Sequence, residues 1–177
     1  MLSHMAGMIW THGYTAAELE RAQALFRLTF PPDLVALLRD RRPVGGPDWT
    51  NEADIRSRLA WPYEGLMFDV EHNLLWLGEW GERPTDAAER AEVLRDVVAR
   101  APMLIPVFSH RYLPATPGRA GNPVFSVHQS DVILYGANLE DYIEREENGW
   151  GCRPWPQAIR EIDFWSELSG VTADRGL

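Results

Sequence analysis

The residues of this chain that could do chemistry are few and far apart. Asp69, Glu71 and His72 lie close together, and His110 and His128 follow later. Such carboxylates and imidazoles could act as acid and base in a small hydrolase, or as metal ligands. Their spacing does not match the His-x-x-x-His or His-Glu-x-x-His patterns of metal sites. We therefore expect no bound metal, and we keep the hydrolase as an alternative function.

The possible nucleophiles are also isolated. Cys152 is followed by Arg153, and a neighbouring positive charge favours a thiolate, but no histidine can be paired with it from the sequence. Ser109 and His110 are adjacent, and adjacent residues of a strand point to opposite faces, so we expect no Ser–His pair. The chain has no Gly-x-Ser-x-Gly elbow, no phosphate-binding glycine loop and no dinucleotide fingerprint. The sequence thus predicts neither a catalytic residue nor a cofactor.

The charge distribution is more informative than these candidates. The chain has 177 residues, with 26 acidic side chains, 17 arginines and no lysine, and its net charge is −9. This charge argues against a nucleic-acid partner, because phosphate binding requires a basic surface. Residues 64–82 contain five carboxylates and no arginine, and residues 138–148 contain five carboxylates and Arg145. These two segments together account for the whole net charge.

The first acidic segment also contains Trp76 and Trp80. Tryptophans among carboxylates suit a basic protein partner, since the aromatic rings supply affinity and the charge speeds the encounter. The alternative is that both tryptophans belong to the core and that the acids form its solvated rim. The predicted partner-binding residues are Asp69, Glu71, Trp76, Glu79, Trp80 and Glu82.

Helices are predicted where capping residues precede a helical apolar period. Thr15 and Glu18 have capping-box spacing before a first helix, and Pro31 and Pro32 open a second. A third, short helix from Trp49 to Trp61 is expected to stop at Pro62. Residues 66–80 are expected to form a helical turn or short strand and then a loop. Further helices are predicted over 86–100 and after Asn138, and a short one from Pro156.

Strands are predicted between these helices. Residues 103–108 form an apolar run, and residues 124–128 and 131–135 are separated by so few residues that they predict a hairpin. Helices, strands and helices in this order predict an α+β fold: one domain over residues 13–177, with a central, mainly antiparallel sheet flanked by helices. Residues 1–12 are expected to be a disordered or tag-like N-terminus.

Compartment and membrane contact can also be predicted. A single cysteine excludes an internal disulfide framework. No apolar run approaches the ~20 residues of a membrane span, and no secretory signal is visible. We therefore expect a cytoplasmic protein without a membrane partner.

Several short motifs resemble those of the SMI1/KNR4 family, which belongs to the SUKH superfamily. Their order and spacing over residues 28–147 carry the likeness, and the tail over 148–177 lies outside the pattern. The motifs are Phe30-Pro31-Pro32-Asp33-Leu34, Trp61-Pro62-Tyr63-Glu64-Gly65-Leu66, Trp76 through Trp80-Gly81, Leu104-Ile105-Pro106-Val107, Asn122-Pro123-Val124-Phe125-Ser126-Val127, Asp131-Val132-Ile133-Leu134-Tyr135-Gly136 and Leu139-Glu140-Asp141-Tyr142-Ile143.

The resemblance implies an α+β fold with an antiparallel sheet and no catalytic residues. Many bacterial members are thought to be immunity proteins that bind and neutralise a toxin, and fungal members help to regulate cell-wall synthesis. We therefore expect a non-enzymatic protein-binding module of the immunity type, whose partner is a basic toxin that it covers. A small hydrolase and a regulatory scaffold without a toxin partner are the alternatives.

Overall fold

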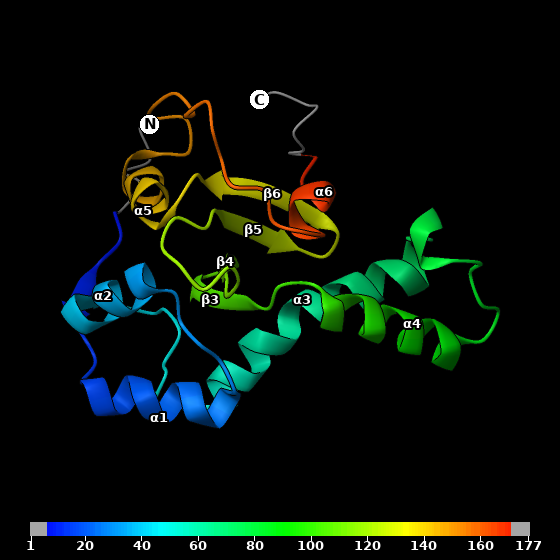
Figure 1. Ribbon diagram of the computed structural model, residues 1–177, viewed down its shortest axis with the longest axis horizontal. Helices are drawn as coiled ribbons and strands as arrows, with labels where there is room; N and C mark the ends of the chain where they lie inside the picture. Colours follow the sequence, from blue (N-terminus) through cyan, green and yellow to red (C-terminus); the bar gives the residue numbers. More distant parts are fainter. Residues whose placement is uncertain (1–6, 171–177) are drawn as a thin grey trace, which may run out of the picture.

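The computed structural model describes residues 7–170. Helices lie on both sides of a central sheet, and a second, smaller sheet lies near the N-terminus (Figure 1). The elements in chain order are β1 (Trp10–His12), α1 (Ala16–Phe26), α2 (Pro32–Asp40), β2 (Arg41–Pro43), α3 (Glu52–His72), the 3-10 helix η1 (Gly78–Trp80), α4 (Ala87–Arg100), β3 (Leu104–Phe108), β4 (Arg111–Pro114), β5 (Val124–His128), β6 (Asp131–Gly136), α5 (Leu139–Asn148) and α6 (Trp165–Leu168).

The central sheet has four antiparallel strands in the order β3-β4-β5-β6. The predicted hairpin is β5 and β6, with Ser126 opposite Ile133, and the predicted α+β fold with an antiparallel sheet is confirmed. Strand β4 (Arg111–Pro114) was not among the predicted strands. Strands β3 and β5 are buried along nearly their whole length. A strand covered on both faces is apolar at successive positions, which explains why no alternation marks these segments.

Each face of the central sheet forms part of one hydrophobic cluster. Ile105 and Leu113 point to the face covered by α1, α2 and α5, whereas Leu104 and Tyr112 point to the face covered by α3 and α4. The C-terminal tail, which we define as residues 149–170, completes this second cluster with Ile162 and Trp165. The tail is therefore part of the fold, although it lies outside the family-like motifs.

The small sheet corrects the prediction for the N-terminus. Strand β1 pairs antiparallel with β2, with Trp10 opposite Pro43, so the expected disordered or tag-like segment is wrong for Trp10–His12. Residues 1–6 lie outside the described residues. The guanidinium carbon of Arg41 lies 4.2 Å from the centre of the Trp10 ring. Because the paired residues are about thirty positions apart in sequence, local patterns could not reveal this pairing.

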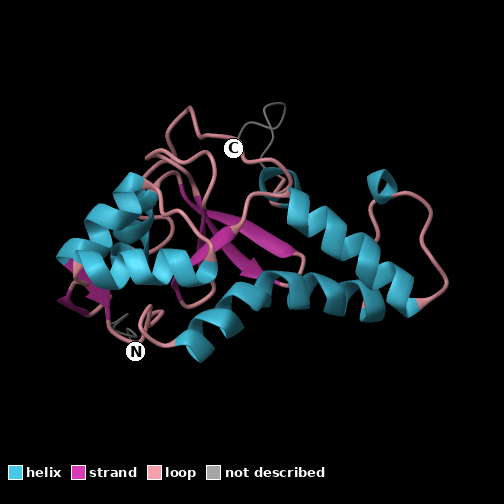
Figure 2. Ribbon diagram, turned by 60° about the horizontal axis from the view of Figure 1, so that its bottom comes forward, coloured by secondary structure: helices cyan, strands magenta, loops and turns pink. Residues whose placement is uncertain are grey.

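The predicted stop at Pro62 is also wrong, because α3 continues through it to His72. A proline inside a helix lacks the N–H that would donate to the carbonyl four residues earlier, here that of Arg58. The Tyr112 hydroxyl donates to this carbonyl instead, at 2.7 Å. Helix α3 bends near its middle (Figures 1 and 2). The orphaned acceptor is thus satisfied from β4, which sequence spacing alone does not show.

The caps of the other helices follow the sequence closely. The Thr15 hydroxyl accepts from the Glu18 N–H at 3.1 Å, and the Glu18 carboxylate accepts from the Thr15 N–H at 2.8 Å, which completes the predicted capping box. Asp86 and Asn138 cap α4 and α5. The short helix expected from Pro156 forms later, as α6. No helix within residues 7–170 is both long and apolar enough to cross a membrane.

Candidate functional site

The structure separates the predicted partner-binding residues of the first acidic segment. Asp69 is 4% exposed, and its carboxylate accepts from the Ser130 N–H at 2.8 Å, from the Ser130 hydroxyl at 2.5 Å and from Asn73 at 2.6 Å. Burial pushes the pKa of Asp69 up, but these hydrogen bonds outweigh it and hold the pKa below its ordinary value. Asp69 therefore holds the β5–β6 turn and does not face a partner.

Asp69 is one of three residues of α3 that contact the end of β5 and the β5–β6 turn. Trp61 donates from its indole to the Val127 carbonyl at 2.9 Å. One turn of helix later, a Cβ on Gly65 would lie 2.9 Å from the Cα of Gln129, so only glycine allows this approach. The spacing of four residues places all three on one face of α3.

Glu71 is also engaged within the molecule. Its two carboxylate oxygens each accept from Arg90 on α4 at 2.7 Å, and Arg90 donates to the Pro84 and Thr85 carbonyls as well. The hydrogen bonds from Arg90 lower the pKa of Glu71. This bidentate pair fastens α3 to α4 and leaves Glu71 little capacity for a partner.

The two tryptophans of the segment pack on each other. The ring centres of Trp76 and Trp80 lie 5.3 Å apart at 85°, and both rings are partly buried against the second hydrophobic cluster. Trp76 donates to the Gly81 carbonyl at 2.9 Å. Of the six predicted residues, only Glu79 and Glu82 are exposed. The packing resembles the core-and-rim alternative more than a ready aromatic docking surface.

The second acidic segment is arranged differently, because α5 has two acidic faces with different roles. Asp141 is buried and accepts from Arg145 at 2.8 Å. The Glu146 carboxylate forms an ion pair with the Arg111 guanidinium, with Oε2 3.4 Å from Nε. Glu140, Glu144 and Glu147 share the opposite side of the helix, at the spacing of three and four residues that defines one face. Asn138 fixes the start of this face by capping α5.

These three carboxylates line a groove between α2 and α5, which we call the α2/α5 groove. Its volume is about 590 Å³, and its other lining residues come from α2, from Arg41 and from the loop at Ala120 and Gly121. Among the lining residues Leu139 is buried, Leu37 and Ile143 are half-buried, and Glu140 and Glu144 are exposed. The groove is lined by Asp33, Leu37, Arg41, Ala120, Gly121, Asn138, Leu139, Glu140, Ile143, Glu144 and Glu147.

The charges of the groove are unbalanced. Four carboxylates face one guanidinium, that of Arg41, which lies over the Trp10 ring and 4.0 Å from Asp40. Within residues 7–170, neither Glu140 nor Glu144 forms an ion pair. Glu147 accepts from the Trp10 indole at 2.8 Å. The α2/α5 groove can therefore hold cationic side chains beside the apolar side chains of Leu37, Leu139 and Ile143.

Two of the residues proposed for a hydrolase, His72 and His110, lie in different pockets. His72 lies against Phe68 on the outer side of α3, with ring centres 4.5 Å apart, whereas His110 lines a separate pocket of about 250 Å³ beside Trp61. Among residues 7–170, no three His, Cys, Asp or Glu side chains are grouped so that they could hold a metal ion.

The expectation that Ser109 and His110 cannot meet is wrong. Both lie in the β3–β4 turn, where Ser109 has a φ of 49°, and the Ser109 hydroxyl is 3.0 Å from the Nδ1 of His110. Arg111, which has only donors, contacts Nε2 of His110, so Nε2 accepts and Nδ1 carries the proton of the neutral ring. In that tautomer Nδ1–H donates to the Ser109 hydroxyl.

Comparison with known proteins adds no relative. No family model, no curated protein and no solved structure matches the chain. The resemblance to the SMI1/KNR4 family therefore stays a prediction that depends on the motifs themselves.

Proposed function

We propose that this protein is a non-enzymatic protein-binding module of the immunity type, and that it binds a cationic segment of a toxin partner in the α2/α5 groove. The observation that carries the proposal is the excess of carboxylates in a groove that apolar side chains also line. The mechanism would be occlusion: the bound protein covers the basic surface through which the toxin acts.

The geometry of the groove suits an arginine or lysine side chain. The aliphatic stem of such a residue could lie on Leu37 and Ile143, while its charged head reaches Glu140 or Glu144. Arginine can bind a carboxylate through two parallel hydrogen bonds, which gives direction as well as attraction. Because these two carboxylates are exposed, each contact is worth only about 0.2–1 kcal/mol, and affinity must come from several such contacts with the apolar area.

The negative charge has a second consequence, which concerns the rate of encounter. A protein of net charge −9 attracts a basic partner over distances near the Debye length, ~8 Å at physiological salt. Association should therefore slow steeply as salt is added, while dissociation changes less. The two acidic segments act together in this steering.

The proposal moves the expected site from the first acidic segment to the second. Asp69 and Glu71 are engaged inside the molecule, whereas Glu140 and Glu144 are exposed at a groove. The family-like motifs support the immunity assignment.

Co-expression with the product of the neighbouring gene tests this function in cells. Wild type should rescue growth if that product is the toxin, and the double variant Glu140→Gln/Glu144→Gln should not. The matched control is Glu89→Gln/Glu92→Gln, which removes the same charge from exposed positions of α4, away from the groove. Full rescue by the groove variant, or a neighbouring product without toxicity, would contradict the proposal.

A further inference from the structure

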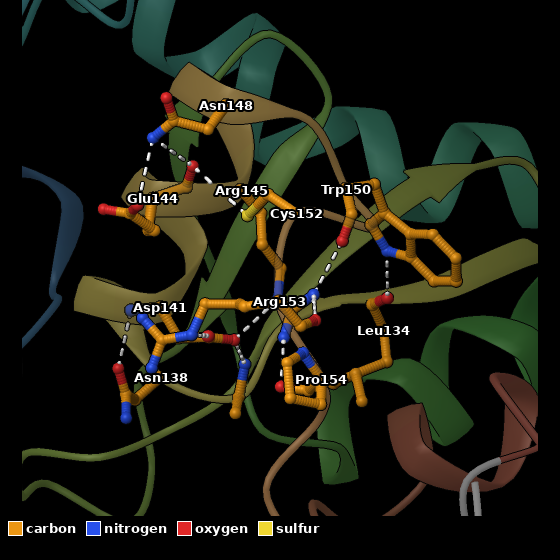
Figure 3. Close-up of polar contacts among 11 residues, drawn as sticks. Leu134, Asn138, Asp141, Glu144, Arg145, Asn148, Trp150, Cys152, Arg153 and Pro154 are labelled. Carbon is orange, nitrogen blue, oxygen red and sulfur yellow. Dashed lines mark hydrogen bonds and ion pairs between the residues drawn. The ribbon is translucent and has the colours of Figure 1, made fainter.

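The C-terminal tail contacts α5 on the side of the helix that faces away from the α2/α5 groove. Arg145, which is fully buried, points away from the groove and donates to the carbonyls of Trp150 at 2.6 Å, Arg153 at 3.1 Å and Pro154 at 3.3 Å (Figure 3). Its guanidinium carbon also lies 3.6 Å from the centre of the Trp155 ring. The face of α5 opposite the groove is thus fixed to the first part of the tail.

The same tail holds the second wall of the groove, the loop at Ala120 and Gly121. Arg160 donates to the Asn122 side chain at 2.6 Å and to the Ala120 carbonyl at 3.1 Å. Asn122 is completely buried and donates in turn to the carbonyls of Pro114 and Pro117, at 2.8 and 3.0 Å. This network orders the loop from the side of the tail.

The loop is also held from the side of α2. The Gly121 N–H donates to the Asp33 carboxylate at 3.1 Å, and Asp33 lines the groove. Gly121 has a φ of 98°, and the Arg160 guanidinium lies 3.3 Å from where its Cβ would be. The loop is therefore confined between Asp33 and Arg160, and its position depends on both.

We propose that the C-terminal tail is a brace that sets the separation of the two groove walls, and that Arg160 is a positioning residue for cation binding in the groove. The second part of this proposal rests on the proposed function. Arg145 fixes one end of the brace to α5, and Arg160 fixes the other end to the loop. A partner in the groove and the order of the tail should therefore stabilise each other.

The variant Arg160→Ala isolates this role, because Ile162 and Trp165 remain buried and keep the tail attached to the core. The matched control is Arg119→Ala, which removes the same charge from an exposed position of the same loop. Arg160→Lys keeps the charge but lacks the planar fork that reaches both acceptors. If Arg160→Ala does not fold, the lysine variant decides the question.

Two measurements are made on each variant. The first is the amide hydrogen exchange of Gly121, observed by NMR, which reports the order of the loop without any ligand. The second is the affinity for a fluorescent hexa-arginine peptide at low salt. For Arg160→Ala we expect Gly121 exchange at least ~10 times faster and peptide affinity about fivefold weaker, because the donor that holds the loop is lost. Arg119→Ala should leave Gly121 exchange unchanged and bind the peptide as well as wild type or better.

The outcomes separate the two proposals. Equal Gly121 exchange in Arg160→Ala and Arg119→Ala would overturn the brace. Faster exchange with unweakened peptide binding would overturn the role of Arg160 in positioning. If wild type does not bind hexa-arginine, the proposed function fails, and Gly121 exchange alone then decides whether the tail braces the loop.

Discussion

The hydrogen bond from Tyr112 to the Arg58 carbonyl leads to a sharp prediction about α3. Tyr112 is 1% exposed, and Pro62 has no N–H to donate to that carbonyl. Tyr112→Phe therefore leaves the acceptor without its partner, and an unsatisfied buried polar group costs about 1–3 kcal/mol. We expect the free energy of unfolding to fall by about 1–2 kcal/mol, since this hydrogen bond is only partly buried.

A double-mutant cycle shows whether the proline causes this cost. In Pro62→Ala the new N–H can donate to the Arg58 carbonyl, so Tyr112→Phe should cost about 1 kcal/mol less in that background than in wild type. The control is Tyr63→Phe: its hydroxyl donates at 3.3 Å to the Ala91 carbonyl, which lies inside α4 and keeps its helical partner. Urea denaturation followed by far-UV circular dichroism measures all these values. Equal costs of Tyr112→Phe in both backgrounds would refute the reasoning.

Two further predictions concern the contacts of Gly65 and Asp69 on α3 with the β5–β6 turn. Gly65→Ala should lower the free energy of unfolding by about 1–3 kcal/mol in urea denaturation, because its Cβ would meet the backbone of Gln129 at 2.9 Å, whereas Gly78→Ala, with open space around it, should be nearly neutral. If Gly65→Ala is as stable as wild type, the backbones of Gly65 and Gln129 do not approach each other so closely that a Cβ is excluded. Because the folded pKa of Asp69 is lowered, its stabilisation is present above the unfolded pKa of about 3.9 and is lost as the pH falls through the folded value. In Asp69→Asn the free energy of unfolding should therefore fall less steeply than in wild type as the pH is lowered below about 3.9. The same acid dependence in both proteins would contradict this role of Asp69.

The parts of the fold that could be predicted are those specified locally. The capping box at Thr15, the cap at Asn138 and the short connection between β5 and β6 all depend on residues within a few positions of each other. The long helix through Pro62 could not be predicted, because its proline is compensated by Tyr112, fifty-four residues from Arg58. Strand β1 could not be predicted for the same reason, since it exists only through its pairing with β2.

The sequence predicted that a binding site would be acidic, but it did not predict which carboxylates would line it. Counting carboxylates identified both acidic segments. Which carboxylates are available to a partner depends on the arginines that pair with them. In the first segment Glu71 forms an ion pair with Arg90. In the second, Glu146 pairs with Arg111 and Asp141 with Arg145. The groove itself requires α2 and α5 to lie side by side, which the order of elements does not specify.

The most direct test of the α2/α5 groove is the affinity for hexa-arginine measured by fluorescence anisotropy at two salt concentrations. Compared with wild type, Glu140→Gln/Glu144→Gln should bind about tenfold more weakly at low salt, since two exposed carboxylate contacts of up to about 1 kcal/mol each are lost. Glu89→Gln/Glu92→Gln should bind like wild type, and added salt should weaken all three. Equal affinities of the two double variants would contradict the account, because the attraction would then come from net charge and not from the groove.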